Sequence, residues 1–455
     1  MTTAVLHVPT RPRDGRAAAP VRIVHLGLGA FHRAHQAWYT AHCADADMWG
    51  IASFTGRAGE PSDSIVAALR AQDHLYTLTL RGPDEDALEV IDSIVAVHSA
   101  AEIDAWVGYI VRPEVAIIST TVTEAGYRLD ADWNPRADDA VVASDLAALA
   151  SGTGSLESPL ALIAHALEQR RLVGGGPLTV MPCDNMPDNG ALVRAGLLAF
   201  ASAVGLELQE WIEENVSFVS TSVDRITPRF SDDDLDLPHA HGLDDAVPVV
   251  TEPFINWILQ GDFAAGRPAW ETAGAEFVAD LEPFENRKLW LLNGAHTAMA
   301  GFSRLRGCAT VADASADPAS RELVEAFWSE ARRHLPVGVR AEEYCTALWE
   351  RFENPRIAHS LAQIAEDSAT KLGVRAAPVA LAELDAGRTA EGCARVIAAW
   401  AAAMIAGQGQ RDSRQADIDA AVASNDATRA LVAVVSPTLA ARAGFVELVD
   451  GALAC

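Results

Sequence analysis

Residues 21–36 read VRIVHLGLGAFHRAHQ, and this stretch decides the fold that we expect. The apolar run at 21–26 has the character of a buried β-strand, and residues 30–39 continue as a helix. Gly27 and Gly29 lie between them. Glycines there permit a tight turn and let the backbone approach a pyrophosphate held at the helix N-terminus. The order of strand, glycine turn and helix predicts the first unit of a dinucleotide-binding fold.

The turn and two later positions supply the residues that we expect at the cofactor. They are Gly27, Leu28, Gly29, Ala30, Phe31, Arg33, Arg57 and Thr121. The third glycine of the usual GxGxxG pattern is missing, since His32 stands in its place. The alternative interpretation is an ordinary turn between a strand and a helix.

The end of the second strand, expected at residues 49–55, bears on the choice between NAD and NADP. An NAD site usually carries Asp or Glu there to bind the ribose hydroxyls. This chain has Ser53, Thr55 and Arg57 in the region instead. Arg57 could accept a 2′-phosphate, which favours NADP slightly, or it could be a surface arginine. The predicted cofactor is therefore NAD or NADP.

The composition limits the class of protein. A chain of 455 residues exceeds the usual size of a single core, so we expect two domains, at 1–279 and 280–455. The net charge of −27 argues against nucleic acid or an anionic membrane as partner, because both require a basic surface. We expect a small molecule to be the partner.

Compartment and metal content follow from a few further features. Six cysteines are scattered without zinc-binding spacing, which is typical of reduced thiols in a cytoplasmic protein. The first 20 residues contain no apolar run of signal-peptide length. The longest apolar run, at 396–407, is too short to span a bilayer and predicts a buried helix. His239 and His241 lie close together but have no third metal ligand near them in the sequence. We therefore expect a cytoplasmic protein without a metal.

The pattern of apolar runs predicts an α/β N-terminal domain of Rossmann type and a mostly α-helical C-terminal domain. Strands are expected at residues 21–26, 49–55, 74–81, 89–98, 114–123, 178–181 and 216–223. Helices are expected at residues 30–39 and 159–171, then at 285–300, 320–335, 341–353, 356–366, 389–406 and 415–424.

Polar side chains follow several of the expected strands. Glu124, Asn185 and Asp224 each come shortly after an apolar run. The carboxyl ends of parallel strands meet at the edge of the sheet where ligands bind. A single polar residue after a strand is typical of an ordinary turn. The three together predict a cleft.

Residues 282–300 read EPFENRKLWLLNGAHTAMA and are expected to form one helix that carries Lys288, Asn293 and His296. At about 100° per residue, Lys288 and His296 lie about 80° apart, and Asn293 lies about 60° beyond His296. An amine, an amide and an imidazole aimed at one cleft can move a proton on a hydroxyl oxygen and stabilise charge there. The alternative is a core-lining helix with a solvated lysine.

Four motifs occur in the order GLGAFHRAHQ, CDNMPDNG, VDRITP and KLWLLNGAH. In this order they resemble the polyol-specific long-chain dehydrogenases, the group of mannitol 2-dehydrogenase and fructuronate reductase. The resemblance covers nearly the whole chain, from about residue 21 to residue 375 and beyond. It implies a Rossmann-type domain, a helical domain, a substrate held between them and no metal.

The resemblance also implies catalytic roles. Lys288 matches the general base that takes the hydroxyl proton as hydride leaves for the nicotinamide. Asn185 and Asn293 match two amides that hold the developing alkoxide. His296 matches an imidazole that orients the substrate oxygen. A lysine that acts as a base near neutral pH requires a lowered pKa, which partial burial in an apolar cleft supplies.

Four other positions concern the substrate and the proton. Asp224 matches a substrate-contacting carboxylate, and Glu124 stands where a carboxylate assists proton passage to solvent. Lys371 matches a substrate-contacting lysine, whereas Gln363 stands where mannitol dehydrogenases place an arginine and the fructuronate reductase branch has glutamine. Lys371 could then face the carboxylate of mannonate. Both residues could instead be polar groups on the outside of a helix.

The predicted activity is reversible, NAD(P)-dependent hydride transfer at a secondary alcohol of a linear polyol, in the manner of mannitol to fructose. The nearest alternative is a D-mannonate oxidoreductase (fructuronate reductase) with the same catalytic groups. A nucleotide-binding sensor that has lost turnover is a third interpretation. The presence of Lys288, Asn185, Asn293 and His296 argues against that one.

Overall fold

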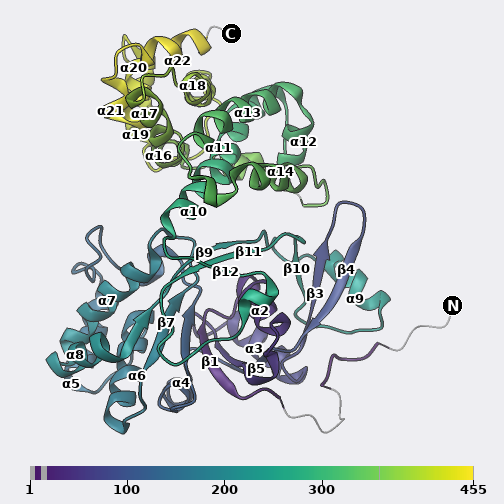
Figure 1. Cartoon of the computed structure of the whole chain (residues 1–455), viewed down its shortest axis with the longest axis vertical. Coiled ribbons are helices and arrows are strands. Elements are labelled where there is room, and N and C mark those ends of the chain that lie inside the picture. Colours follow the sequence, from purple (N-terminus) through teal and green to yellow (C-terminus); the bar gives the residue numbers. More distant parts are fainter. Residues whose placement is uncertain (1–5, 12–17, 358, 454–455) are drawn as a thin grey trace. The chain divides into compact units, whose positions relative to one another are not determined.

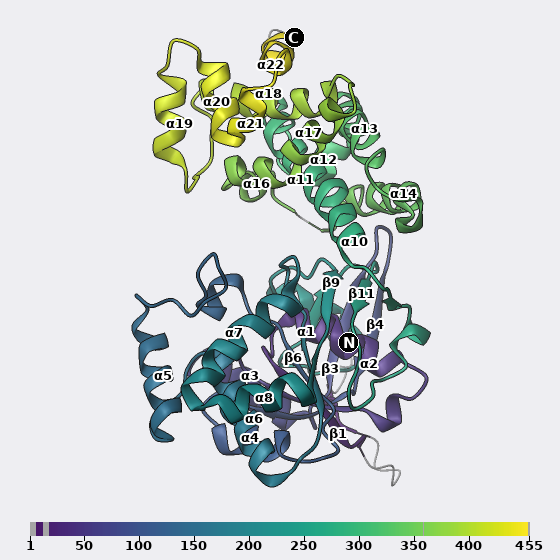
Figure 2. The same cartoon turned by 60° about the vertical axis from the view of Figure 1, so that its left-hand side comes forward.

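The computed structural model describes residues 6–11, 18–357 and 359–453. Much of the N-terminal segment discussed above, at positions 1–5 and 12–17, lies outside the described residues, as does Cys455. The chain divides into two compact units, Met1–Glu282 and Pro283–Cys455 (Figures 1 and 2). This division falls three residues beyond the boundary expected from the sequence.

A six-stranded parallel sheet is the centre of the first unit. Its strand order is β5-β2-β1-β6-β7-β8, and every neighbouring pair is parallel. The strands are β1 (Val21–Leu26), β2 (Gly50–Phe54), β5 (Ile94–His98), β6 (Ile117–Thr120), β7 (Leu178–Pro182) and β8 (Val216–Phe218). Counted along the chain within this sheet, the order is that of the doubly wound dinucleotide-binding fold. The order reverses between β1 and β6, which is where such sheets bind ligands.

Alternate residues of β1 face two different cores, because successive side chains of a strand point to opposite faces of its sheet. Ile23 belongs to one buried cluster, whereas Val24 and Leu26 belong to a second one. Helices cover both faces of the sheet. They are α1 (Ala30–Ala34), α2 (Gln36–His42), α3 (Ser62–Ala71), α4 (Ile103–Ile110), α5 (Ala140–Ser151), α6 (Pro159–Val173), α7 (Asn189–Val204) and α8 (Leu206–Asn215).

Two three-stranded sheets and a short helix complete the first unit. The sheets have the orders β10-β3-β4 and β12-β11-β9. The elements are β3 (Tyr76–Arg81), β4 (Asp86–Ile91), β9 (Ser220–Asp224), α9 (Asp236–Ala240), β10 (Val249–Thr251), β11 (Asn256–Gln260) and β12 (Glu276–Phe277).

Two of the expected strands are each divided between two sheets. The run at 89–98 contains the end of β4 and all of β5, and the run at 216–223 contains β8 and most of β9. Each break falls at a buried residue inside the apolar pattern, Ser93 in the first and Val219 in the second. The Ser93 hydroxyl donates to the Ala37 carbonyl at 2.7 Å, and the Ser93 carbonyl accepts from the Ile51 N–H of β2 at 2.9 Å. Apolar periodicity alone does not reveal such a break.

The second unit is α-helical, as expected. Its elements are α10 (Glu282–Arg287), a π-helical turn (Lys288–Asn293), α11 (Gly294–Phe302), α12 (Val311–Ala316), α13 (Pro318–Arg332), α14 (Ala341–Phe352), α15 (Leu361–Ile364), α16 (Ser368–Arg375), α17 (Ala377–Asp385), α18 (Glu391–Ile405), α19 (Gln415–Val422), α20 (Ala427–Val435), α21 (Pro437–Ala440) and α22 (Phe445–Leu453). The expected helix at 356–366 is reduced to α15, because the chain before it pairs Ser360 with Thr310 as a β-bridge. Most of the apolar run at 396–407 lies in α18, which is buried as expected.

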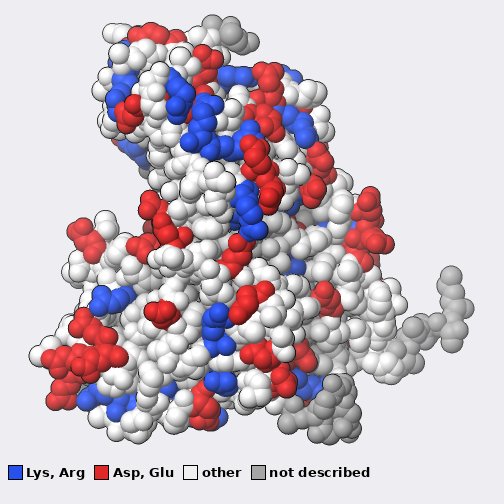
Figure 3. Space-filling view, in the orientation of Figure 1, with Lys and Arg blue, Asp and Glu red and all other residues white. Residues whose placement is uncertain are grey.

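Surface and cysteine chemistry agree with the composition. Figure 3 shows Asp and Glu side chains scattered over both units, with Lys and Arg side chains among them. The five cysteines in the described part of the chain are free thiols. Within that part, none of the helices combines the length and the apolar character needed to cross a bilayer.

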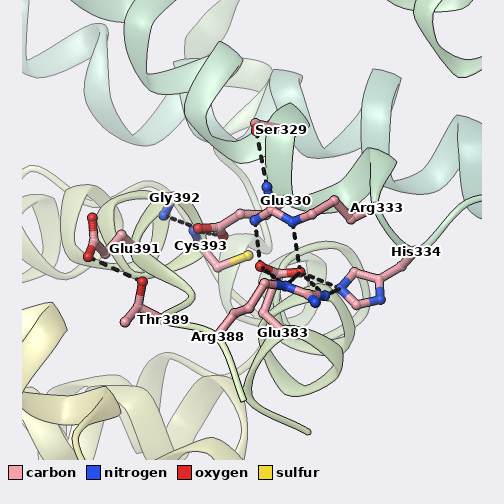
Figure 4. A network of polar contacts seen from close by, with 10 residues as sticks. All are labelled: Ser329, Glu330, Arg333, His334, Glu383, Arg388, Thr389, Glu391, Gly392 and Cys393. Carbon is pink, nitrogen blue, oxygen red and sulfur yellow. Dashed lines mark hydrogen bonds and ion pairs between the residues drawn. The ribbon is translucent and has the colours of Figure 1, made fainter. Parts of the chain in front are cut away.

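A buried carboxylate network joins α13 to α17 and α18 in the second unit (Figure 4). Glu383, whose side chain is 1% exposed, accepts hydrogen bonds from Arg333, Arg388 and His334. Burial by itself would raise the pKa of Glu383, but the hydrogen bonds from these three residues outweigh it and lower the pKa to about 2. Nearby, Glu330 accepts from two backbone N–H groups in the first turn of α18.

We expect Glu383→Gln to lower the free energy of unfolding by about 1.5–3 kcal/mol at pH 7, because it removes a charged acceptor from three donors. The carboxyl pKa is about 2 in the folded chain against an ordinary 4.5. Its stabilisation is therefore complete above the ordinary value and is lost as the pH falls towards 2. Denaturant titrations at pH 7 and pH 3 measure this. The difference between the two proteins should shrink at pH 3.

Glu353→Gln is the matched control. Glu353 is 52% exposed and pairs with Arg321, which is 38% exposed, at 2.5 Å. An exposed pair of this kind contributes about 0–1 kcal/mol. Equal losses of unfolding free energy from the two substitutions would show that the buried network contributes no more to stability than an exposed ion pair.

Candidate active site

The turn after β1 has room for glycine only. Gly27 has a φ of +122°, and a Cβ placed on it would lie 2.4 Å from Thr121 Oγ1 and 2.5 Å from the Thr121 carbonyl oxygen. The Thr121 hydroxyl donates to the Gly27 carbonyl at 2.9 Å, and the Thr121 N–H donates to the Leu26 carbonyl at 2.9 Å. The turn thus closes on the end of β6 at the point where the strand order reverses. Its own N–H groups are engaged, those of Gly27 and Leu28 with the Phe54 carbonyl and that of Gly29 with the Gly27 carbonyl.

Gly29 begins α1 and is exposed. A Cβ on Gly29 would meet only the Gly27 carbonyl oxygen, at 3.8 Å, and its φ of −104° suits any residue. The neighbouring Ala30 is exposed as well, whereas Leu28 is buried and Phe31 is half-buried against His35. Among the predicted cofactor residues of the turn, Gly29 and Ala30 therefore present backbone to solvent.

The histidine at the third glycine position has a structural partner. His32 stacks on His25 of β1, with ring centroids 3.4 Å apart, and its Nε2 lies 2.9 Å from Ser53 Oγ. His25 in turn contacts Ser119 Oγ at 2.8 Å and Thr121 Oγ1 at 3.1 Å. Burial lowers the pKa of His25 to about 3 and the pKa of His32 well below its usual value. Both rings are therefore neutral and pack as part of the core under the turn.

Two arginines predicted at the cofactor have different surroundings. Arg33 is 5% exposed, donates to the Val247 carbonyl and lies over the Tyr76 ring, 5.4 Å from its centroid. Its side chain is thus engaged within the first unit. Arg57 is exposed beyond the end of β2, and Thr55 before it is buried. A contact of Arg57 with a 2′-phosphate remains a prediction.

The loop after β7 contains buried residues that form internal hydrogen bonds and one exposed amide side chain. Asp184 accepts from the Val122 N–H at 2.5 Å and from the Tyr127 hydroxyl. Burial raises the pKa of Asp184 to about 7, against the opposing effect of these donors. Asn189 donates to the Asp184 carbonyl at 3.0 Å and to the Thr221 carbonyl at 2.8 Å. Asn185 is exposed between them. The internal bonds fix the loop that carries Asn185.

The other two residues predicted at strand ends also lie in the first unit. Asp224 is the last residue of β9 and is 6% exposed. Glu124 begins a 3-10 turn at Glu124–Tyr127 and is exposed. Their roles remain predictions.

The segment that carries Lys288 is not one uniform α-helix. Residues Lys288–Asn293 form a π-helical turn between α10 and α11, and the Gly294 N–H reaches back five residues to the Leu289 carbonyl. The angles expected from 100° per residue are therefore wrong across this turn. In a π turn the backbone hydrogen bonds join residues five apart, so Lys288 and Asn293 fall on the same side of the segment, as residues four apart do in an α-helix. π turns occur frequently at functional sites.

A pocket of 270 Å³ lies within the second unit. It is lined by Asn293, His296, His359, Gln363, Ile364, Lys371 and Arg375. The structure thus brings together four of the predicted residues, one each from the π turn, α11, α15 and α16. The His296 ring lies 4.8 Å from the His359 ring and 5.0 Å from that of Phe352, which sets its orientation.

Two cations, Lys371 and Arg375, line the pocket. The Lys371 ammonium donates to the Ile364 carbonyl at 2.9 Å and to the Glu366 carbonyl at 2.5 Å. Burial and the neighbouring Arg375 lower the pKa of Lys371. The Arg375 guanidinium donates to Thr297 Oγ1 at 2.8 Å and to the Asn293 carbonyl at 3.2 Å, and burial lowers its pKa to about 10.

His359 was not among the predicted residues. It reaches the pocket because the chain after α14 folds back to the Thr310–Ser360 bridge. Burial and the charge of Arg351 lower the pKa of His359. No local pattern marks this histidine in the sequence, since its position depends on a contact between distant segments.

Lysine is scarce in this chain. The sequence contains 33 arginines and two lysines, Lys288 and Lys371. Arginine cannot be deprotonated in proteins, whereas a lysine amine changes its pKa readily when it is buried. One lysine lines the pocket and the other precedes Asn293 by five residues. The positions of the two lysines favour functions that require an amine.

Comparison with known proteins identifies the family. The model of the mannitol dehydrogenase Rossmann domain matches residues 21–272, and that of the mannitol dehydrogenase C-terminal domain matches residues 280–450. The chain belongs to the mannitol dehydrogenase family. The sequence-based identification, the α/β fold class with a helical second domain and the assignment as an oxidoreductase of secondary alcohols are confirmed.

Three known proteins illustrate the similarity. D-mannonate oxidoreductase of Escherichia coli is 38% identical over 82% of this chain and 78% of its own length. A substrate-free D-sorbitol dehydrogenase structure is 28% identical, with a TM-score of 0.88 over 98% of this chain and 95% of that one. The Pseudomonas fluorescens mannitol 2-dehydrogenase ternary complex with NAD and D-mannitol is 33% identical, with a TM-score of 0.79 over 98% of this chain and 94% of that one.

We expect Gly29→Ala to weaken NADH binding by about tenfold or more, which corresponds to about 1.4 kcal/mol. The new methyl group fits the folded chain but occupies the place that a pyrophosphate approaches. Titration of NADH fluorescence measures the affinity, and thermal unfolding confirms that the fold is intact. Gly108→Ala in α4 is the control, since a Cβ there meets nothing within 4 Å. Unchanged affinity in Gly29→Ala would place the cofactor elsewhere.

Proposed function

We propose that this chain catalyses reversible, nicotinamide-dependent hydride transfer at a secondary alcohol of a linear polyol, in the manner of mannitol to fructose. The observation that carries the proposal is the pocket that brings Asn293 and His296 together with Lys371. The π turn places Lys288 on the side of the segment that carries Asn293. An amine, an amide and an imidazole are thus available in one helical unit.

Each of these groups has a distinct task in the proposed reaction. Lys288 takes the proton from the reacting hydroxyl group as the general base. The amides of Asn293 and Asn185 donate to the oxygen as it becomes an alkoxide, and neutral donors do so without adding charge beside the lysine. His296 orients the same oxygen. Asp224 binds a further hydroxyl of the substrate.

Proton release and cofactor binding use residues of the first unit. Glu124, which is exposed, passes the proton to solvent. The N-terminus of α1, which begins at Ala30, holds the pyrophosphate, and Gly29 before it leaves that approach free of a side chain. The bound nicotinamide ring accepts or returns the hydride.

The proposal includes no metal. Among the described residues, no cluster of three His, Cys, Asp or Glu side chains could hold a metal ion. The cofactor is NAD, as in the mannitol 2-dehydrogenase complex. The lack of an acidic residue after β2 and the exposure of Arg57 leave NADP as the alternative.

A sugar acid is the second candidate substrate. Lys371 and Arg375 both line the pocket, and a carboxylate on the substrate requires a cation within reach. Gln363 lies in the same pocket. The similarity to D-mannonate oxidoreductase extends over most of the chain. The same catalytic groups would serve both substrates.

A grid of initial rates distinguishes these substrates. NAD⁺ and NADP⁺ are each combined with mannitol, arabinitol, sorbitol, mannonate and altronate, and the reduced nicotinamide is followed by absorbance. We expect turnover of at least one polyol. Turnover of mannonate alone would select the sugar-acid reaction. Binding of NADH without turnover of any substrate would leave the fold correct and the substrate class wrong.

We expect Lys288→Met to lower kcat by about 10²–10⁴-fold, as the loss of a general base does. Affinity for NADH should not change, since the cofactor residues lie in the first unit. Lys371→Met is the matched control, because it removes the only other lysine of the sequence. That variant should raise KM and leave kcat nearly intact. A Lys288→Met enzyme with normal kcat would exclude the lysine as the base.

A further inference from the structure

We propose that Arg375 is a positioning residue that holds the π turn at Lys288–Asn293 in the geometry needed for hydride transfer. Its predicted effect on turnover rests on the proposed function. Its contacts with the turn do not.

The backbone hydrogen bonding departs from that of an α-helix immediately after Asn293. The Gly294 N–H donates to the Leu289 and Leu291 carbonyls, so the bond to Trp290 that an α-helix would make is absent from this position. π turns are rare and short. A segment of this kind is stable only where surrounding contacts favour it over a regular helix.

Arg375 and Thr297 provide such contacts from outside the turn. The Arg375 guanidinium donates to the Asn293 carbonyl at 3.2 Å and to Thr297 Oγ1 at 2.8 Å. The Thr297 hydroxyl donates to the same carbonyl at 3.0 Å. The carbonyl of Asn293 therefore lies between two side-chain donors, one of which carries a charge. Hydrogen bonds from charged groups are the stronger ones.

The helix that carries Arg375 is fixed independently of the π turn. Arg375 ends α16, whose first turn is capped by Asp412 from the loop before α19. Asp412 is 7% exposed, and its carboxylate accepts from the Ala369 N–H at 2.9 Å and from the Arg414 N–H at 2.9 Å. Asp367 accepts from the Ser413 N–H at 2.7 Å and joins the same loop to α16. The helix that carries Arg375 is thus held in place by contacts other than those with the π turn.

The π turn matters for the reaction because it changes the angle between the Lys288 and Asn293 side chains. In a regular helix of about 100° per residue, Lys288 and Asn293 would point about 140° apart. The π turn brings them onto one side, where a base and an alkoxide donor can act on one oxygen. Loss of the Arg375 contact releases the Asn293 carbonyl and lets the turn relax towards a regular helix. The expected effect is a slower hydride-transfer step.

Two substitutions test the contact from its two ends. We expect Arg375→Met to lower kcat by about 10²-fold with a small change in KM, since misplacement of a catalytic group by about 1 Å has an effect of that size. Arg375→Lys should recover part of the loss. Thr297→Val should lower kcat by a smaller factor, whereas Thr297→Ser keeps the hydroxyl and should behave as the native enzyme. Arg429→Met is the control for the loss of an arginine, because Arg429 donates to the Ala440 carbonyl outside the pocket.

The kinetic result separates this role from substrate binding. A rise in KM for mannonate alone, at normal kcat, would make Arg375 a ligand of the substrate carboxylate and overturn the proposal. A primary deuterium isotope effect on kcat should increase in Arg375→Met, because hydride transfer becomes slower than product release. Unchanged kcat and isotope effect in both Arg375→Met and Thr297→Val would also overturn it.

Hydrogen exchange tests the contact without any turnover. Peptides that cover residues 288–297 should exchange faster in Arg375→Met and Thr297→Val than in the native protein, and Arg429→Met should leave them unchanged. Equal exchange in all of these proteins would overturn the proposal even if the enzyme is active. Faster exchange in a protein that turns over no substrate would retain the contact and reject the proposed function instead.

Discussion

The close contact between the turn after β1 and the end of β6 is the constraint on which the first unit depends. Gly27 lies against Thr121 with no room for a Cβ, and two hydrogen bonds donated by Thr121, to the Gly27 and Leu26 carbonyls, join the two strand ends. Because β1 and β6 lie in the middle of the sheet, this contact fixes the crevice at which the strand order reverses. The buried histidine pair beneath it fills the space that a third glycine would leave, and it does so without charge.

Buried carboxylates perform a related task for the helices. Asp145 accepts from the Ser158 N–H at the start of α6, Glu330 from the first turn of α18, and Asp412 from the first turn of α16. In each case the cap comes from another element, so it satisfies orphan donors and joins two segments at once. An acidic chain has many such groups available. The charge of −27 therefore has a structural use as well as an effect on solubility.

The sequence predicts the parts of the fold that depend on local pattern. The strand at 21–26, the glycine turn and the helical second domain all follow from apolar periodicity and glycine placement. The π turn does not, since KLWLLN is almost continuously apolar and gives no period from which to measure rotation. Arg33 shows the same limit at the site, because its guanidinium bonds to Val247, which is 214 residues away. His359 and Arg375 likewise reach the pocket through contacts between distant segments.

Because the sequence contains two lysines, few of its groups can react with reagents that modify amines. Reagents that modify amines can react only with Lys288, Lys371 and the N-terminal amine, because the other 33 cationic side chains are guanidinium groups. Reductive methylation with ¹³C-formaldehyde would therefore introduce side-chain labels at two positions, one lining the pocket and one at the start of the π turn. Their carbon resonances would report the titration of each amine directly, without mutation and in a spectrum free of overlapping lysine signals.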